Sequence, residues 1–234
     1  MVGDLPATYV ATRQGLHAVA EHVLAAALHR ATGRIGLRPT PGGFGTPWFG
    51  GRRLGVEGVD LVVEERDDAA GAGSGAAVVR ARRAPLTTVG EAATFAGVEP
   101  GAPAGVYPPA TPLVPGAPLA LDPAAAAVVH DWCATVGAAL AVWRAELVAR
   151  GVPIAGEPQL WPEHFDLALV AGEVNYGGSP GDDDHDEPYA YVGPWRRDGL
   201  AGEYWNEPFG ASRPRHDLPD PRTVVAFFRA ANLE

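Results

Sequence analysis

The sequence predicts an α+β protein in which an antiparallel sheet is covered on one face by helices. Two long segments carry apolar residues at three- and four-residue spacing, which is typical of helices. Several short segments alternate apolar and polar residues, which is typical of half-buried strands. The 30 glycines and 23 prolines fall mainly between these segments, and 47% of the 234 residues are hydrophobic. We therefore expect a loop-rich globular protein with a substantial core.

The first predicted helix runs from about residue 12 to residue 32, with Gly33 as its C-cap. His22 and His29 lie seven residues apart on the polar face of this helix, about 10.5 Å along its axis. Because this separation is too large for one metal ion, we expect both to be surface residues.

Alternating residues predict strands at 35–37, 59–63 and 77–81, and the acidic, glycine-rich segment DDAAGAGSG predicts a turn between the last two. The resulting β-hairpin would place Glu64 and Glu65 opposite arginines of its second strand, namely Arg80, Arg82 or Arg83.

Capping signals predict the other helices. Thr88 and Glu91 have capping-box spacing ahead of a short helix. Asp122-Pro123 is an N-cap followed by proline at the first helical position, and the apolar spacing behind it continues to Gly151. Asp220-Pro221 repeats this signal for a final helix.

Cys133 lies in the second long predicted helix. We expect it to be a small buried thiol rather than a nucleophile.

The chain is interpreted as one domain, 1–234, with two similar halves, 1–98 and 122–234, joined by the proline-rich connector 99–121. Each half has a long helix, several strands and a short helix, which suggests a pseudo-duplication with one sheet continuous across both halves. Two separate domains are the alternative. In the second half, strands are predicted at 165–171 and 188–193, with a weaker one at 203–205.

The segments LWPEHFDLAL, EPYAYVGPW, GEYWNEPFG and DPRTVVAFFRAA resemble the C-terminal half of an uncharacterised actinobacterial family known only as a domain of unknown function. The first helix, the hairpin and TTVGEAATFAG are similar to the first half of that family. The resemblance implies a strand at Phe165–Ala168, a long loop and an aromatic strand at Tyr189–Tyr191. It implies no activity and no catalytic residues.

Candidate catalytic residues are His164 and Asp166. Strand alternation places them on the same face, about 6.8 Å apart, in a stretch whose two faces are mostly apolar. Partly desolvated polar groups need partners. They either form a structural hydrogen-bonded pair or face a pocket as metal ligands or as a base with its orienting group.

The acidic loop, residues 182–187, supplies further candidates. Its carboxylates repel one another unless they are solvated, paired with arginine or bound to a cation. If the loop folds over the strand, His164, Asp166, Asp184, His185 and Glu187 would suit a divalent metal such as iron, zinc or manganese. The spacing fails as an EF-hand because Glu187 and Gly193 stand where glycine and glutamate are required.

Aromatic residues are dense in the second half and either build core or line a cavity for a small molecule. The candidate ligand-binding residues are Trp161, Tyr189, Tyr191, Trp195 and Arg196.

The GGSPG segment, which begins at Gly177, matches the serine-hydrolase pattern G-x-S-x-G. However, the residue after the serine is Pro180, which lacks the N–H that an oxyanion hole needs at this position.

The formal charge of −10 opposes binding to nucleic acid. A single cysteine and the absence of a signal-like or membrane-spanning stretch predict a cytoplasmic protein with no membrane partner.

Two hypotheses for the function remain. The first is a cytoplasmic enzyme, assisted by a metal ion, with its site at His164, Asp166 and the acidic loop. The second is a non-catalytic module that binds a small molecule or a protein through the aromatic cleft.

Overall fold

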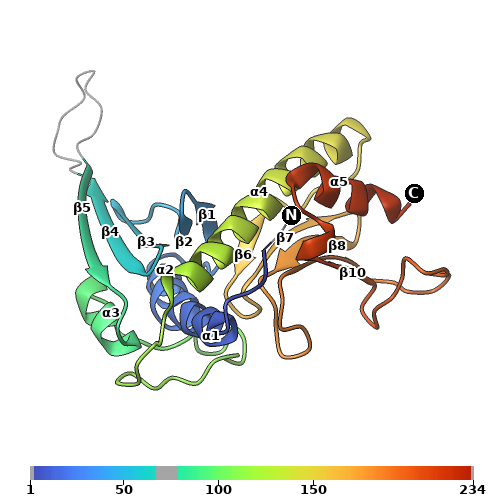
Figure 1. The fold of residues 1–234 in the computed structure, drawn as a ribbon. Helices are drawn as coiled ribbons and strands as arrows, with labels where there is room; N and C mark the ends of the chain where they lie inside the picture. Colours follow the sequence, from blue (N-terminus) through green and yellow to red (C-terminus); the bar gives the residue numbers. More distant parts are fainter. Residues whose placement is uncertain (1–2, 67–78, 233–234) are drawn as a thin grey trace.

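A computed structural model describes residues 3–66 and 79–232 and shows two antiparallel five-stranded sheets with helices packed against them. This confirms the predicted α+β class. Figure 1 shows α4 (Pro123–Ala149) crossing the middle of the molecule, with the first sheet on its left and the second sheet on its right.

The first long helix consists of α1 (Tyr9–Val19), a π-helical segment (Ala20–Ala25) and α2 (Ala26–Thr32). Gly33 ends it in the left-handed conformation, with φ +73°, as predicted. His22 is not a surface residue, because only 1% of it is exposed and its Nε2 lies 3.0 Å from the carbonyl oxygen of Thr111. The prediction was wrong because the connector folds back over this side of the helix.

The first sheet has the order β1-β2-β3-β4-β5, and its strands are β1 (Arg38–Thr40), β2 (Gly43–Gly45), β3 (Arg52–Glu57), β4 (Asp60–Arg66) and β5 (Val79–Pro85). The predicted hairpin is confirmed as β4 paired with β5, and its turn lies outside the described residues. Glu65 lies opposite Arg80 in the ladder, whereas Glu64 forms its ion pair with Arg53 of β3. Residues 35–37 precede β1 rather than forming a strand, and β2 and β3 were not predicted.

The predicted caps are found where expected. Thr88 accepts a hydrogen bond from the Glu91 amide at the start of α3 (Val89–Ala96). Asp122 accepts two amide hydrogen bonds at the start of α4, and Asp220 forms a capping box at the start of α5 (Pro221–Ala230).

By length and composition, α4 could cross a membrane. However, half of its most apolar 18-residue stretch is buried inside the protein, and the core helix of a folded domain passes the same test.

The second sheet has the order β10-β9-β8-β7-β6, and its strands are β6 (Gln159–Trp161), β7 (Asp166–Ala171), β8 (Val174–Ser179), β9 (Tyr189–Pro194) and β10 (Ala211–Pro214). Strands 165–171 and 188–193 are confirmed to within a residue. Residues 203–205 form turns rather than a strand, β10 was not predicted, and β8 occupies a segment that the sequence suggested was loop.

The two halves share one order of elements: a long helix, five consecutive antiparallel strands and a short helix. They form two sheets rather than the one continuous sheet that was expected. The sheets meet at an isolated antiparallel bridge between Leu37 and Leu160, and α4 packs against strands of both.

Candidate functional site

The second sheet has one face packed against α4 and α5. Tyr176 points to the covered face, where its ring contacts Trp143 of α4 and Phe228 of α5 at centroid distances of 5.4 and 5.6 Å. Strand alternation sends Asp166, Ser179 and Tyr189 to the opposite side, here called the second open face.

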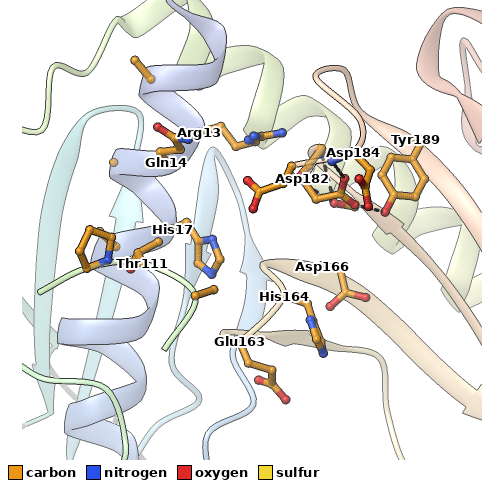
Figure 2. A pocket seen from close by; sticks show the side chains of 18 of the residues that line it. Arg13, Gln14, His17, Thr111, Glu163, His164, Asp166, Asp182, Asp184 and Tyr189 are labelled. Carbon is orange, nitrogen blue, oxygen red and sulfur yellow. Dashed lines mark hydrogen bonds between the residues drawn. The ribbon is translucent and has the colours of Figure 1, made fainter. Parts of the chain in front are cut away.

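A cavity of about 1170 Å³ lies over the second open face. Its other walls are one side of α1, the connector from residue 110 to residue 120, and the acidic loop after β8. Figure 2 shows Arg13, Gln14 and His17 projecting from the helix on one side, with Asp166 and the acidic loop on the other. This cleft is the candidate functional site.

Gly177 determines the shape of the cleft floor. A Cβ atom at this position would lie 2.6 Å from Cζ of Tyr191 and 2.7 Å from the carbonyl oxygen of Leu167. The missing side chain therefore allows the Tyr191 ring to lie across β8. In this position the Tyr191 hydroxyl donates a hydrogen bond to Oδ2 of Asp166.

Asp166 is the most unusual residue of the cleft, because it is a carboxylate of which only 7% is exposed. Among the described residues, its Oδ1 has no hydrogen-bond partner. Burial raises the pKa of Asp166 to about 6, against the opposing effects of the Tyr191 hydrogen bond and nearby His164. Burial also raises the pKa of Tyr191, so its hydroxyl stays protonated and remains a donor.

The acidic loop is held in place by hydrogen bonds to Asp182. Oδ1 accepts from the amides of Asp184 and His185, both at 2.9 Å, and Oδ2 accepts from the Tyr189 hydroxyl at 2.5 Å. Burial alone would raise the pKa of Asp182, but these donors hold it below its usual range. The loop is therefore organised by its own backbone and by β9.

His185 links the acidic loop to the segment before β10. Its ring nitrogens lie 3.2 Å from Asp182 and 3.2 Å from Glu207, and Glu207 accepts a hydrogen bond from Ser212 at 2.6 Å. Partial burial lowers the pKa of His185, but the hydrogen bonds to the two carboxylates outweigh it and raise the pKa above its ordinary value. His185 thus serves as a bridge between carboxylates.

Arg13 and His17 of α1 are cleft residues that the sequence interpretation missed. Arg13 is 5% exposed and donates to the carbonyl oxygen of His185 at 3.1 Å, where Gly181 leaves room for it. His17 lies 2.7 Å from the carbonyl oxygen of Pro162 and stacks on Phe165. Burial lowers the pKa of His17. Arg13 and His17 are four residues apart, which puts two polar groups on one side of a largely apolar helix. This spacing could have identified them from the sequence.

Six of the predicted site residues line the cleft: His164, Asp166, Asp184, Tyr189, Tyr191 and Trp195. The other four lie elsewhere. The Arg196 guanidinium pairs with Glu173 on the surface, Glu187 contacts His216 at 3.0 Å, and Trp161 and His185 lie outside the cavity wall.

The predicted pairing of His164 with Asp166 is not found. β7 begins at Asp166, and His164 belongs to the tight turn that precedes it, where Phe165 has φ +53°. His164 is exposed, whereas Asp166 is buried, and none of the hydrogen bonds in the described structure joins them. The alternation rule failed because residues 162–165 form the turn between β6 and β7, so His164 is not part of a strand.

The predicted metal ligands are not brought together. Asp166 contacts Tyr191, His185 contacts Asp182 and Glu207, and Glu187 contacts His216. Within residues 3–66 and 79–232, no group of three or more His, Cys, Asp or Glu side chains is arranged to hold a metal ion. Of the five, His164, Asp166 and Asp184 line the cleft, whereas His185 and Glu187 are held outside its wall by Glu207 and His216.

Ser179 and Cys133, which the sequence analysis set aside as nucleophiles, have structural positions. Ser179 ends β8 and its hydroxyl donates to the carbonyl oxygen of Gly181 at 3.1 Å; a loop follows it, not the helix of a nucleophile elbow. Cys133 is buried in α4, and burial raises the pKa of its thiol to about 12.

Comparisons with protein-family models, curated proteins and solved structures found no match to the chain. The resemblance to an actinobacterial family therefore stays a prediction.

Proposed function

We propose that this protein binds a small organic molecule in the cleft over the second open face. The observation that supports this most directly is Asp166, a buried carboxylate that lines the cavity and has no partner for Oδ1 among the described residues. Burying an uncompensated carboxylate costs free energy. A ligand that donates to Asp166 would offset this cost.

The composition and size of the cleft support the same proposal. Small-molecule sites are typically concave, of about 300–1,000 Å³, and combine aromatic walls with a few polar groups. Here the cavity is about 1170 Å³, and Tyr189, Tyr191, Trp195 and Phe209 supply aromatic surface to its lining. The cleft therefore has room for a molecule of metabolite size.

A screen of chemically diverse fragments by ligand-observed NMR tests this proposal, because the fragments together sample many classes of small molecule. Gln14 is an exposed cleft residue on α1, so Gln14→Trp fills the cavity without disturbing the core. Ala141→Trp, on the exposed side of α4 and outside the cavity, is the matched control. We expect fragments that bind the wild type and Ala141→Trp but lose binding to Gln14→Trp. Fragments that bind all three proteins equally would contradict the proposal.

Acid–base catalysis in the same cleft is a second candidate function. The observation that favours it is the pKa of Asp166, which burial raises to about 6, close to neutral pH. Carboxyl groups with such values, held in a cleft next to a hydroxyl such as that of Tyr191, are suited to transferring protons to and from a bound molecule.

Mass spectrometry of the fragments that bind distinguishes catalysis from simple binding. Each fragment is incubated with the wild type and with Asp166→Asn. Conversion by the wild type that is lost in Asp166→Asn would support catalysis, and recovery of every fragment unchanged from the wild type would count against it.

A further inference from the structure

The charges around the cleft indicate what kind of molecule it takes. Five carboxylates line the cavity, against two guanidinium groups, which gives a formal charge of −3 with neutral histidines; the carboxylates are Glu163, Asp166, Asp182, Asp183 and Asp184, and the guanidinium groups are Arg13 and Arg197. A cavity lined by one sign of charge concentrates ligands of the opposite sign. The lining favours a cation.

The two guanidinium groups of the cleft are already bound to backbone oxygens: Arg13 donates at the acidic loop, and Arg197 donates to the carbonyl oxygen of Pro208. The Arg13 side chain extends from α1 toward Asp182 and Asp184 in Figure 2, and its Nη1 donates to the carbonyl oxygen of His185. An anion bound by Arg13 would have to approach these carboxylates, which opposes anion binding. In the described part of the chain, no arginine forms an ion pair with Asp166.

The surroundings of Asp166 suit an ammonium group. The rings of Tyr189 and Tyr191 lie 6.3 Å apart between centroids, and the ring of Phe209 meets that of Tyr191 edge to face at 6.3 Å. The negative faces of aromatic rings attract organic cations, and the attraction grows when water is excluded. The Tyr191 hydroxyl bonds to Oδ2, which leaves Oδ1 as the atom still in need of a donor.

We propose that the cleft takes a small organic amine, bound as its ammonium ion to Asp166 with Tyr189 and Tyr191 as aromatic walls. This assignment rests on the proposed function, since it names the class of ligand for the same cleft. The amine supplies a positive charge at Asp166, with which no arginine of the described chain forms an ion pair.

Calorimetric titration with three molecules of similar size and different charge tests the assignment. The probes are 2-phenylethylamine, 2-phenylethanol and phenylacetate, measured against the wild type at pH 7.5. We expect the amine to bind most tightly and phenylacetate most weakly. Asp166→Asn keeps the shape and the oxygen that accepts from Tyr191, and it should weaken amine binding by roughly tenfold to a hundredfold, the range for hydrogen bonds to charged groups.

Glu99→Gln is the control for the change in net charge, because Glu99 is exposed and does not line the cavity. It should bind the amine as the wild type does. Equal amine affinity in Asp166→Asn and the wild type, or tighter binding of phenylacetate than of the amine, would overturn the assignment while leaving the cleft as a binding site. Failure of 2-phenylethylamine to bind the wild type would also overturn the assignment, whereas the proposed function fails only if the fragment screen finds no binding that Gln14→Trp removes.

Discussion

The two sheets share the same order of strands but differ in how the charges on their outer faces are balanced. The first open face is the side of the first sheet that carries Arg53, Glu57, Asp60, Glu64 and Arg83. Arg53 pairs with Glu64, and Arg83 pairs with both Glu57 and Asp60, so each of these charges has a partner. The second open face instead contains a buried carboxylate with an unpartnered oxygen, under a cavity.

We propose that this difference marks the half of the molecule that binds a ligand. Opposite charges on neighbouring strands commonly pair on the exposed face of a sheet. A carboxylate that is buried without a counter-charge lowers stability, and such strain is often found where a ligand completes the arrangement.

The largest contrast is expected when a glycine on each face is replaced by alanine. At Gly177 the new Cβ would collide with Tyr191 and with the Leu167 carbonyl oxygen, whereas at Gly55 the nearest atom would be 3.5 Å away. We expect Gly177→Ala to lower the free energy of unfolding by about 3 kcal/mol, as overpacking does. Gly55→Ala should be neutral or stabilise by up to about 1 kcal/mol. Urea denaturation measures both, and equal effects would contradict the packing described for the cleft floor.

The next contrast concerns single carboxylates. Asp60 pairs with Arg83 at 3.3 Å on the surface, so Asp60→Asn should cost no more than about 1 kcal/mol. Asp166→Asn should instead stabilise the free protein by about 2 kcal/mol at pH 7.5, because it removes a buried charge. Urea denaturation of both variants at this pH measures the two effects, and a loss of stability in Asp166→Asn would contradict the contrast.

The stability gained in Asp166→Asn should depend on pH. An aspartate whose pKa is raised by folding to about 6 binds its proton more tightly in the folded state, so it destabilises the fold above pH 6 and ceases to do so as the pH falls toward 4. The difference in unfolding free energy between Asp166→Asn and the wild type should therefore shrink between pH 7 and pH 4. A difference that stays constant over this range would show that Asp166 titrates normally.

The smallest effect is expected at His185. Its pKa is raised because it lies between Asp182 and Glu207, so its contribution to stability is fully present below the unfolded value near 6.5 and is lost as the pH rises through the folded value. His185→Gln should lower the unfolding free energy by about 0.5 kcal/mol at pH 6, the scale of a partly exposed ion pair. By pH 9 the loss should be smaller, and a greater loss at pH 9 would contradict the assigned bridge.

The sequence predicted those elements whose signals are local. Asp122-Pro123 and Asp220-Pro221 mark helix starts because a cap and its helix are adjacent in the chain, and Gly33 marks an end for the same reason. Strand β8, Val174–Ser179, was missed because its glycines are typical of loops, although Gly177 is needed under Tyr191 and Gly178 against Val136 of α4.

The site could be predicted only in part. Asp166, Tyr189 and Tyr191 were found because buried carboxylates and dense aromatic residues stand out in a strand pattern. The partners of His22 and the inward position of Arg13 depend on contacts with segments 89 and 172 residues away, at Thr111 and His185. The predicted metal ligands are not assembled for a similar reason, because His185 and Glu187 contact Glu207 and His216, which are 22 and 29 residues away in the sequence.

The most direct test of the account is an NMR titration of the Asp166 carboxyl carbon with and without saturating 2-phenylethylamine. Because an ammonium ion binds the ionised carboxylate, the account predicts a midpoint near pH 6 in the free protein that falls by about one pH unit or more when the amine is bound. An Asp166 midpoint that is the same in both states would contradict the claim that the cleft binds an amine at this residue.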